Sequence, residues 1–406
     1  MGVALYILFS LLFFLLGLNC NNSKYTKLFT FIIFVFPFTN LNTNWHINFQ
    51  IPIFLFFILG GLLKLRFKSI KFYVLDYKIL LAILAFLFFV LITIPLALDH
   101  TIINIFKDLR FIVFGVILYV FVKLNGSLKL DYNYINKLIK WNFLLSLIIY
   151  FLLYKYEIHK YITKDNYFSI NEVRYMNYAT FVLPFYVLHC LANDIRISFT
   201  NWIYIIIPLL ASGNRTISLI LLFFIGLSFL KKVSVRKILL VFSALLSIVV
   251  FMVFNIQKIS ETSALFRFKK LLSLEYLVSI LNTRLSPFYN ALESFSLVNY
   301  FLGKGIGFTY YIPWFHYRKN LDDYNIYLDS LLPTLYGKYG LFFFLPLIFF
   351  FYFLKYLSDV KSFKYYLLLF IILSLTNSFI YQNYLTLVLL FIFLFSQNIL
   401  KKKVHS

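Results

Sequence analysis

The chain has 406 residues, of which 62% are apolar and only 13% are charged. A soluble domain averages about half apolar and about a quarter charged residues, and disordered chains have low hydrophobicity. The composition therefore argues against an ordinary soluble protein and a disordered one. It predicts that many apolar residues face a lipid bilayer.

Long apolar runs recur along the chain. A membrane-spanning helix needs roughly 20 apolar residues, within a range of about 17 to 25, and most of the runs are near this length. The two runs on either side of Arg215 are short and count either as two helices or as one broken element. The sequence thus predicts an all-α, polytopic membrane protein with 12–13 transmembrane helices. The thirteen candidate spans are 2–19, 27–41, 48–64, 79–98, 109–124, 138–154, 177–193, 199–213, 215–230, 237–254, 331–354, 365–381 and 384–400.

The formal net charge of +23 is distributed unevenly between the connecting segments. In a soluble protein this charge would indicate nucleic-acid binding, but here the basic residues lie in short clusters between apolar runs. The segments on one side of the predicted membrane hold 22 of the 38 Lys and Arg residues and 4 of the 15 acidic residues. The positive-inside rule places that side in the cytoplasm. No nucleic-acid partner is expected.

This layout predicts one integral membrane domain over 1–406, with a large external loop over 255–330 and a smaller one over 155–176. Within the large loop, apolar residues recur at three- and four-residue spacing over about 285–298, which predicts an amphipathic helix. Ser286 and Pro287 suit the start of that helix. The helix is expected to lie on the membrane surface, and in a functional interpretation it also covers an active site.

Two charged residues at span boundaries are candidates for chemistry. Arg215 follows Ser212 and Gly213 and precedes a predicted helix, a setting that suits binding of anionic oxygens; alternatively, its side chain extends to the interface without a function. Asp329 precedes the span over 331–354. It is interpreted either as the helix N-cap or as a general base.

The loop also contains a run of alternating glycines and one histidine. Gly303, Gly305 and Gly307 permit positive φ angles and close backbone approach, but the run lacks the context of a dinucleotide or Walker motif. His316 lies among aromatic residues that suit an interfacial belt or sugar stacking, and imidazole is a generic base. The two cysteines show no metal-ligand spacing. No metal site and no cofactor are predicted.

Three patterns occur in order on the predicted outer side: SGNRT at 212–216, NTRLSPFYNAL at 282–292 with FLGKGIG at 301–307, and DSLLPTLYGKYGL from Asp329. Together with the hydropathy layout, they resemble the O-antigen polymerase and O-antigen ligase superfamily. Members of that superfamily are bacterial multi-pass glycosyltransferases of the C-type.

The resemblance implies an enzyme of the cytoplasmic (inner) membrane with its active site on the periplasmic face. Its substrate would be an oligosaccharide carried on undecaprenyl diphosphate, used without a nucleotide sugar or a metal. Arg215 and Arg284 would hold the leaving diphosphate, with Asp329 as the base. Arg174 would bind acceptor or sugar, and the three glycines and His316 would contribute to substrate binding.

The polymerase branch is favoured because Asp329 and Ser330 stand where the ligase branch usually carries His-Asn. The polymer would be O-antigen or capsule, and a chain-length regulator is a possible partner. One alternative is a ligase that transfers glycan to lipid A core. There His316 would replace the ligase histidine in space, although its position in the sequence differs from that of the ligase histidine. Another is a transporter or flippase for lipid-linked sugars, which is disfavoured because the predicted spans are nearly free of charge.

Overall fold

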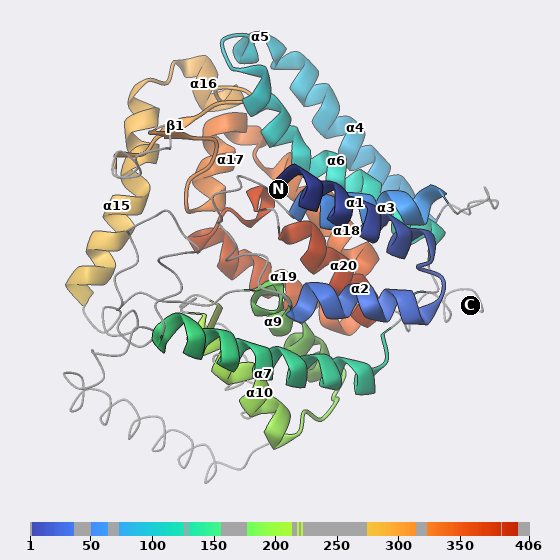
Figure 1. Ribbon diagram of the computed structural model, residues 1–406. Coiled ribbons are helices and arrows are strands. Elements are labelled where there is room, and N and C mark those ends of the chain that lie inside the picture. The colour runs from blue at the N-terminus through green and yellow to red at the C-terminus, as the bar shows by residue number, and fades with distance from the viewer. Residues whose placement is uncertain are drawn as a thin grey trace. The chain divides into compact units, whose positions relative to one another are not determined.

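The protein is mainly α-helical, as the sequence predicts (Figure 1). In the part of the chain that the structure describes, the only strands are the two-residue β1 (Tyr310–Tyr311) and β2 (Tyr324–Asn325), which pair antiparallel. This computed structural model describes residues 2–35, 50–63, 73–125, 128, 130–155, 177–212, 217–218, 221, 274–313, 323–382 and 384–396.

The chain divides into two compact units, each made of two separate stretches. Unit 1 comprises Met1–Phe57 and Lys129–Leu277, and unit 2 comprises Ile58–Leu128 and Val278–Ser406. The expectation of one membrane domain over 1–406 stays a prediction.

Unit 1 is a set of apolar helices joined by aromatic and polar contacts. Phe29 stacks on Phe57 with ring centroids 3.6 Å apart. Asn177 accepts a hydrogen bond from the Thr180 N–H at the start of α9, and its side-chain amide donates to the buried Asn142 at 2.6 Å. The helices are α1 (Gly2–Leu18), α2 (Ser23–Val35), most of α3 (Gln50–Leu63), α7 (Tyr132–Lys155), α9 (Tyr178–Ala192) and α10 (Phe199–Ala211).

Unit 2 contains the long helices α4 and α6 and all of the C-terminal helices. α4 packs along α18 (Figure 1), and η5 lies against α6. The elements are α4 (Val74–Ile92), α5 (Ile94–Ala97), α6 (Ile102–Leu124), most of α15 (Leu274–Glu293), α16 (Leu297–Leu302), α17 (Leu331–Tyr339), the 3-10 helix η4 (Gly340–Phe342), α18 (Phe344–Leu357), α19 (Val360–Thr376), the 3-10 helix η5 (Phe379–Tyr381) and α20 (Leu385–Ser396).

A helix is present in every expected span that falls on described residues, but the span over 331–354 is not one straight helix. The segments Leu331–Phe342 and Phe344–Leu357 meet at 111°. Gly340 ends α17 shortly before this break with a φ of 54°, and a Cβ on it would sit 2.3 Å from the Phe301 carbonyl oxygen. The expectation of a single continuous span is therefore wrong here, because the turn depends on a close contact with a distant segment. The expected span 237–254 lies outside the described residues, and so does the span 215–230 apart from residues 217, 218 and 221.

The helix expected over 285–298 has different bounds. α15 runs through Pro287 to Glu293, and α16 follows after a short break. Pro287 lacks the N–H that would bond to the Thr283 carbonyl, and the Ser286 hydroxyl donates to that carbonyl instead, at 2.9 Å. The expected start at Ser286 and Pro287 is therefore wrong, because a side chain replaces the missing backbone bond.

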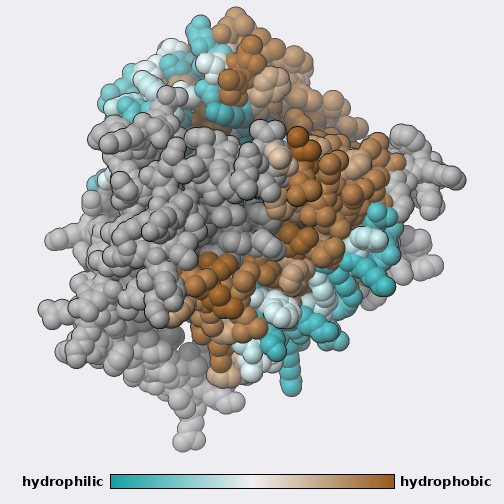
Figure 2. All heavy atoms as spheres, viewed as in Figure 1, coloured by the Kyte–Doolittle hydropathy of each residue, from teal (hydrophilic) through white to brown (hydrophobic). Residues whose placement is uncertain are grey.

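α4 is the helix in the described residues that is long and apolar enough to cross a membrane, and the bent pair α17–α18 is a second candidate if it counts as one span. Five shorter helices are also apolar. Leu81, Phe88 and Leu91 are exposed on α4, and Figure 2 shows hydrophobic surface over this part of unit 2. α4 thus presents an uncovered apolar face.

Candidate functional site

Two of the predicted catalytic residues, far apart in the sequence, are in contact in unit 2. Arg284 lies on α15, and its Nε is 3.3 Å from the Asp329 Oδ2. Both side chains reach solvent, with exposed fractions of 36% and 52%. The N-cap of α17 is Ser330, so the interpretation of Asp329 as the N-cap is wrong. Its carboxylate is directed to an arginine instead.

Buried hydroxyl groups fix the backbone that carries Asp329. The Leu328 N–H donates to the Thr334 hydroxyl at 2.9 Å, and the Ser378 hydroxyl donates to the Leu328 carbonyl at 2.5 Å. The two hydroxyl oxygens are 3.1 Å apart. A connected network of this kind holds its members in one arrangement. Asp329 is therefore an exposed carboxylate on a fixed segment.

An aromatic stack connects this segment to a second arginine. The Tyr327 ring stacks on the Tyr381 ring with centroids 5.6 Å apart, and the Arg110 Nη2 donates to the Tyr381 carbonyl at 2.7 Å. Sequence reasoning missed Arg110 because it lies at the edge of an apolar span and outside every recognisable motif.

The three glycines of the loop take positive φ angles of 76°, 85° and 84°. A Cβ on Gly303 would lie 2.2 Å from the Lys338 carbonyl oxygen. The Gly305 N–H donates to that same carbonyl at 3.0 Å, and the Gly307 N–H donates to the Asp108 Oδ2 at 2.5 Å. Close backbone approach is thus confirmed, but the partner is the protein itself. A role for these glycines in binding substrate stays a prediction.

A buried ion pair underlies the glycine loop. The Lys338 Nζ contacts the two Asp108 carboxylate oxygens at 2.5 and 2.6 Å, and both side chains are 0% exposed. The same Nζ lies 5.1 Å from the centroid of the Tyr381 ring. Desolvation of two charges is offset only where the geometry satisfies both of them. The sequence shows Lys338 as a charge inside an apolar run, and such a charge needs a partner. No sequence pattern identified Asp108 as that partner.

A second polar cluster lies where the start of α4 meets the end of α6. The buried Asp76 accepts a 2.5 Å hydrogen bond from the Tyr119 hydroxyl and forms an ion pair with Lys123. The Lys123 ammonium also lies near the rings of Tyr73 and Tyr356. Asp76 accepts from the Tyr73 N–H at 2.6 Å as well. These contacts give the cluster a structural role at the start of α4.

Three predicted site residues, Arg174, Arg215 and His316, lie outside the described residues. In the ranges that are described, no group of three or more His, Cys, Asp or Glu side chains gathers in a way that could hold a metal ion. The described part of the candidate site therefore comprises the Arg284–Asp329 contact, the hydroxyl network around Leu328, and Arg110.

The fold and site define an α-helical protein with an open arginine–carboxylate pair above a polar network. The chain belongs to DUF6369, described as a family of unknown function, whose model matches residues 2–403. No curated protein and no solved structure matches the chain.

Proposed function

We propose that the chain is a multi-pass membrane glycosyltransferase that polymerises a surface polysaccharide, either O-antigen or capsule. It would transfer undecaprenyl-diphosphate-linked glycan onto another lipid-linked repeat unit at the outer face of the cytoplasmic membrane. The observation that carries this proposal is the contact between Arg284 and Asp329. In this proposal Arg284 is the cation for the leaving group and Asp329 is the base for the acceptor, and their contact supports a shared site.

Each member of the pair would have its own task in the reaction. The acceptor hydroxyl oxygen forms the new bond to the anomeric carbon while the bond from that carbon to the phosphate oxygen breaks. The hydroxyl proton passes to the Asp329 carboxylate, acting as a general base. The departing diphosphate keeps the electron pair, and Arg284 binds its oxygens. Arg215 as a second diphosphate ligand stays part of this proposal.

The contacts within unit 2 support the proposed orientation in the membrane. Residues from segments assigned to the outer side meet each other, as where the His100 Nδ1 contacts the Ile306 carbonyl oxygen at 2.7 Å. Residues assigned to the cytoplasmic side also meet each other, as in the Asp76–Lys123 pair. The uncovered apolar face of α4 supports a bilayer as the surrounding solvent.

A second candidate function is a transporter or flippase for lipid-linked sugars. Discontinuous helices and charges buried between helices are features of transporter folds. The 111° break between α17 and α18 and the buried Asp108–Lys338 pair favour this candidate. Against it, the open Arg284–Asp329 pair provides groups suited to chemistry.

The decisive experiment is a reaction of the purified protein in phospholipid nanodiscs with lipid-linked repeat units extracted from its own source. We expect glycans of two or more joined repeats, detected by mass spectrometry. The variants Arg284→Ala and Asp329→Asn should lose at least about a hundredfold of this activity. Lys355→Ala changes an exposed lysine on α18 and serves as the control.

Each other outcome identifies a different function. Normal joining by both site variants at normal protein levels would contradict the proposal. Transfer only to added lipid A core would indicate the ligase. Movement of the lipid-linked sugar across a vesicle membrane without bond formation would indicate the transporter.

A further inference from the structure

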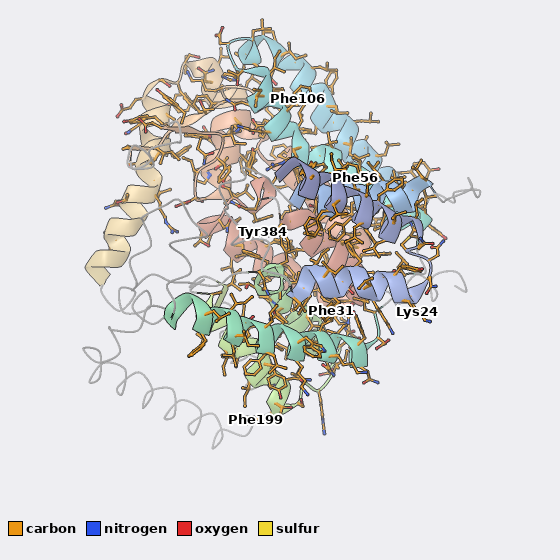
Figure 3. All side chains as sticks on the ribbon, viewed as in Figure 1. Lys24, Phe31, Phe56, Phe106, Phe199 and Tyr384 are labelled. Carbon is orange, nitrogen blue, oxygen red and sulfur yellow. The ribbon has the colours of Figure 1, made fainter. Side chains whose placement is uncertain are left out.

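Arg110 lies in an exposed stripe of α6 that is mainly apolar and holds one other charged residue, Lys107. Residues at three- and four-residue spacing share a helix face, so Ile103, Phe106 and Val113 lie on the same face as Arg110. Their exposed fractions are 67%, 70% and 50%, and Phe106 is marked on α6 in Figure 3. Arg110 itself is partly exposed. A ligand at its guanidinium would therefore touch hydrocarbon on both sides.

Arg110 forms no ion pair with an acid in the described part of the chain, although the Asp108 carboxylate attracts its charge. The nearest acid in sequence, Asp108, already binds the Lys338 ammonium and the Gly307 N–H. Among the described residues, the guanidinium makes one hydrogen bond, from its Nη2 to the Tyr381 carbonyl. A partly buried cation surrounded by apolar groups is costly unless an anion accompanies it. The arrangement leaves guanidinium N–H groups free to bind one.

We propose that Arg110 binds a phosphate group of a lipid. Guanidinium groups bind phosphate oxygens through paired hydrogen bonds, and the apolar stripe on either side would pack against the hydrocarbon chain of the same molecule. This inference rests on the proposed function for the insertion of α6 in a membrane. A free phosphate ion would leave the exposed Phe106 and Val113 side chains unpaired, so the ligand is a lipid.

The position of Arg110 gives this lipid two sources. Arg110 holds the Tyr381 carbonyl, the Tyr381 ring stacks on Tyr327, and Asp329 follows two residues later. The phosphate is therefore either the diphosphate of the carrier lipid or the headgroup of an ordinary anionic phospholipid at the edge of the site.

The test measures lipid retention on the full-length protein in nanodiscs of phosphatidylcholine alone, with added phosphatidylglycerol, or with added undecaprenyl diphosphate. The variant Arg110→Gln keeps a donor for the Tyr381 carbonyl but removes the charge. Lys355→Met removes an exposed lysine on α18 and is the control. We expect Arg110→Gln to lower retention of an added lipid about tenfold, as read by native mass spectrometry, and Lys355→Met to leave it unchanged.

The two sources give separate results. Loss confined to undecaprenyl diphosphate assigns the site to the carrier lipid, and loss confined to phosphatidylglycerol assigns it to a membrane phospholipid. Unchanged retention of both lipids by Arg110→Gln overturns the proposal. If that variant does not fold, photo-crosslinking of a diazirine phosphatidylglycerol and a diazirine undecaprenyl diphosphate to the native protein decides. Labelled peptides containing Phe106 to Val113 support the site, and their absence with both probes overturns it.

This readout is independent of catalysis. Retention that depends on Arg110 while Arg284→Ala joins repeats normally would leave the lipid site standing and the catalytic role of Arg284 wrong. Retention that ignores Arg110 while Arg284→Ala abolishes joining would have the opposite meaning.

Discussion

Two of the ion pairs in unit 2 lie in opposite environments, and their difference separates a structural role from a proposed functional one. Asp108 and Lys338 are completely buried, and the carboxylate also accepts the Gly307 N–H. Arg284 and Asp329 meet through a longer contact with both side chains reaching solvent. The buried pair is committed to holding α6, α17 and the glycine loop together. The open pair can separate at little cost when a ligand arrives.

Breaking the buried pair should have the largest effect on stability. Lys338→Ala leaves Asp108 as a lone buried carboxylate, and such changes typically cost about 3–5 kcal/mol. We expect a strongly lowered melting temperature in detergent, measured by scanning fluorimetry. The double change Asp108→Asn with Lys338→Met should be less destabilising than Lys338→Ala. Melting of Lys338→Ala like the parent protein would show that the pair is not buried as described.

The glycine loop provides the next test, since it packs on the same buried pair. Gly303→Ala places a methyl group against the Lys338 carbonyl at a φ of 76°. Strained backbone of this kind costs on the order of 1–3 kcal/mol. Lys304→Ala changes the neighbouring partly exposed side chain, which donates to the Ser294 carbonyl, and should have little effect. Equal melting temperatures for the two variants would contradict the packing role of Gly303.

Removing the open pair should hardly change stability. Surface ion pairs contribute about 0–1 kcal/mol, so Arg284→Ala and Asp329→Ala should melt within that range of the parent. The same variants should lose the joining activity. A double-mutant cycle on melting temperature gives the coupling energy, and a value well above that range would mean that the pair is structural.

The smallest effect on stability is expected for an exposed ion pair in unit 1, between Lys27 on α2 and Asp131 just before α7. The Lys27 Nζ lies 2.9 Å from the Asp131 Oδ2, and this hydrogen bond lowers the pKa of Asp131 below its ordinary value of 3.8. The pair therefore stabilises the fold above pH 3.8, and that contribution disappears as the pH falls through the lower, folded-state pKa. Because both side chains are exposed, we expect only a few tenths of a kcal/mol. Lys27→Met should flatten the pH dependence of unfolding below pH 4, and a slope equal to that of the parent would contradict this assignment.

Most helices could be predicted because a long apolar run requires no partner to be recognised. The helix predictions were wrong where a contact with a distant segment, or a side-chain hydrogen bond, outweighed the local sequence pattern. Gly340 ends a helix because it lies against the Phe301 carbonyl. Pro287 sits inside a helix because Ser286 bonds to the carbonyl that proline leaves open.

Arg284 and Asp329 could be selected from the sequence, since both stand in patterns that resemble a known superfamily. Their contact could not be derived, because no spacing rule relates α15 to the start of α17. Arg110 had no signal at all. The role proposed for Arg110 depends on the pairing of Asp108 with Lys338. Only the three-dimensional structure shows that pairing.

The sequence by itself determined the helical class, the apolar runs and the uneven charge, because these depend on composition and order along the chain. Tertiary structure decided which charges are buried together and which stay open, because burial and pairing depend on segments that meet only after folding.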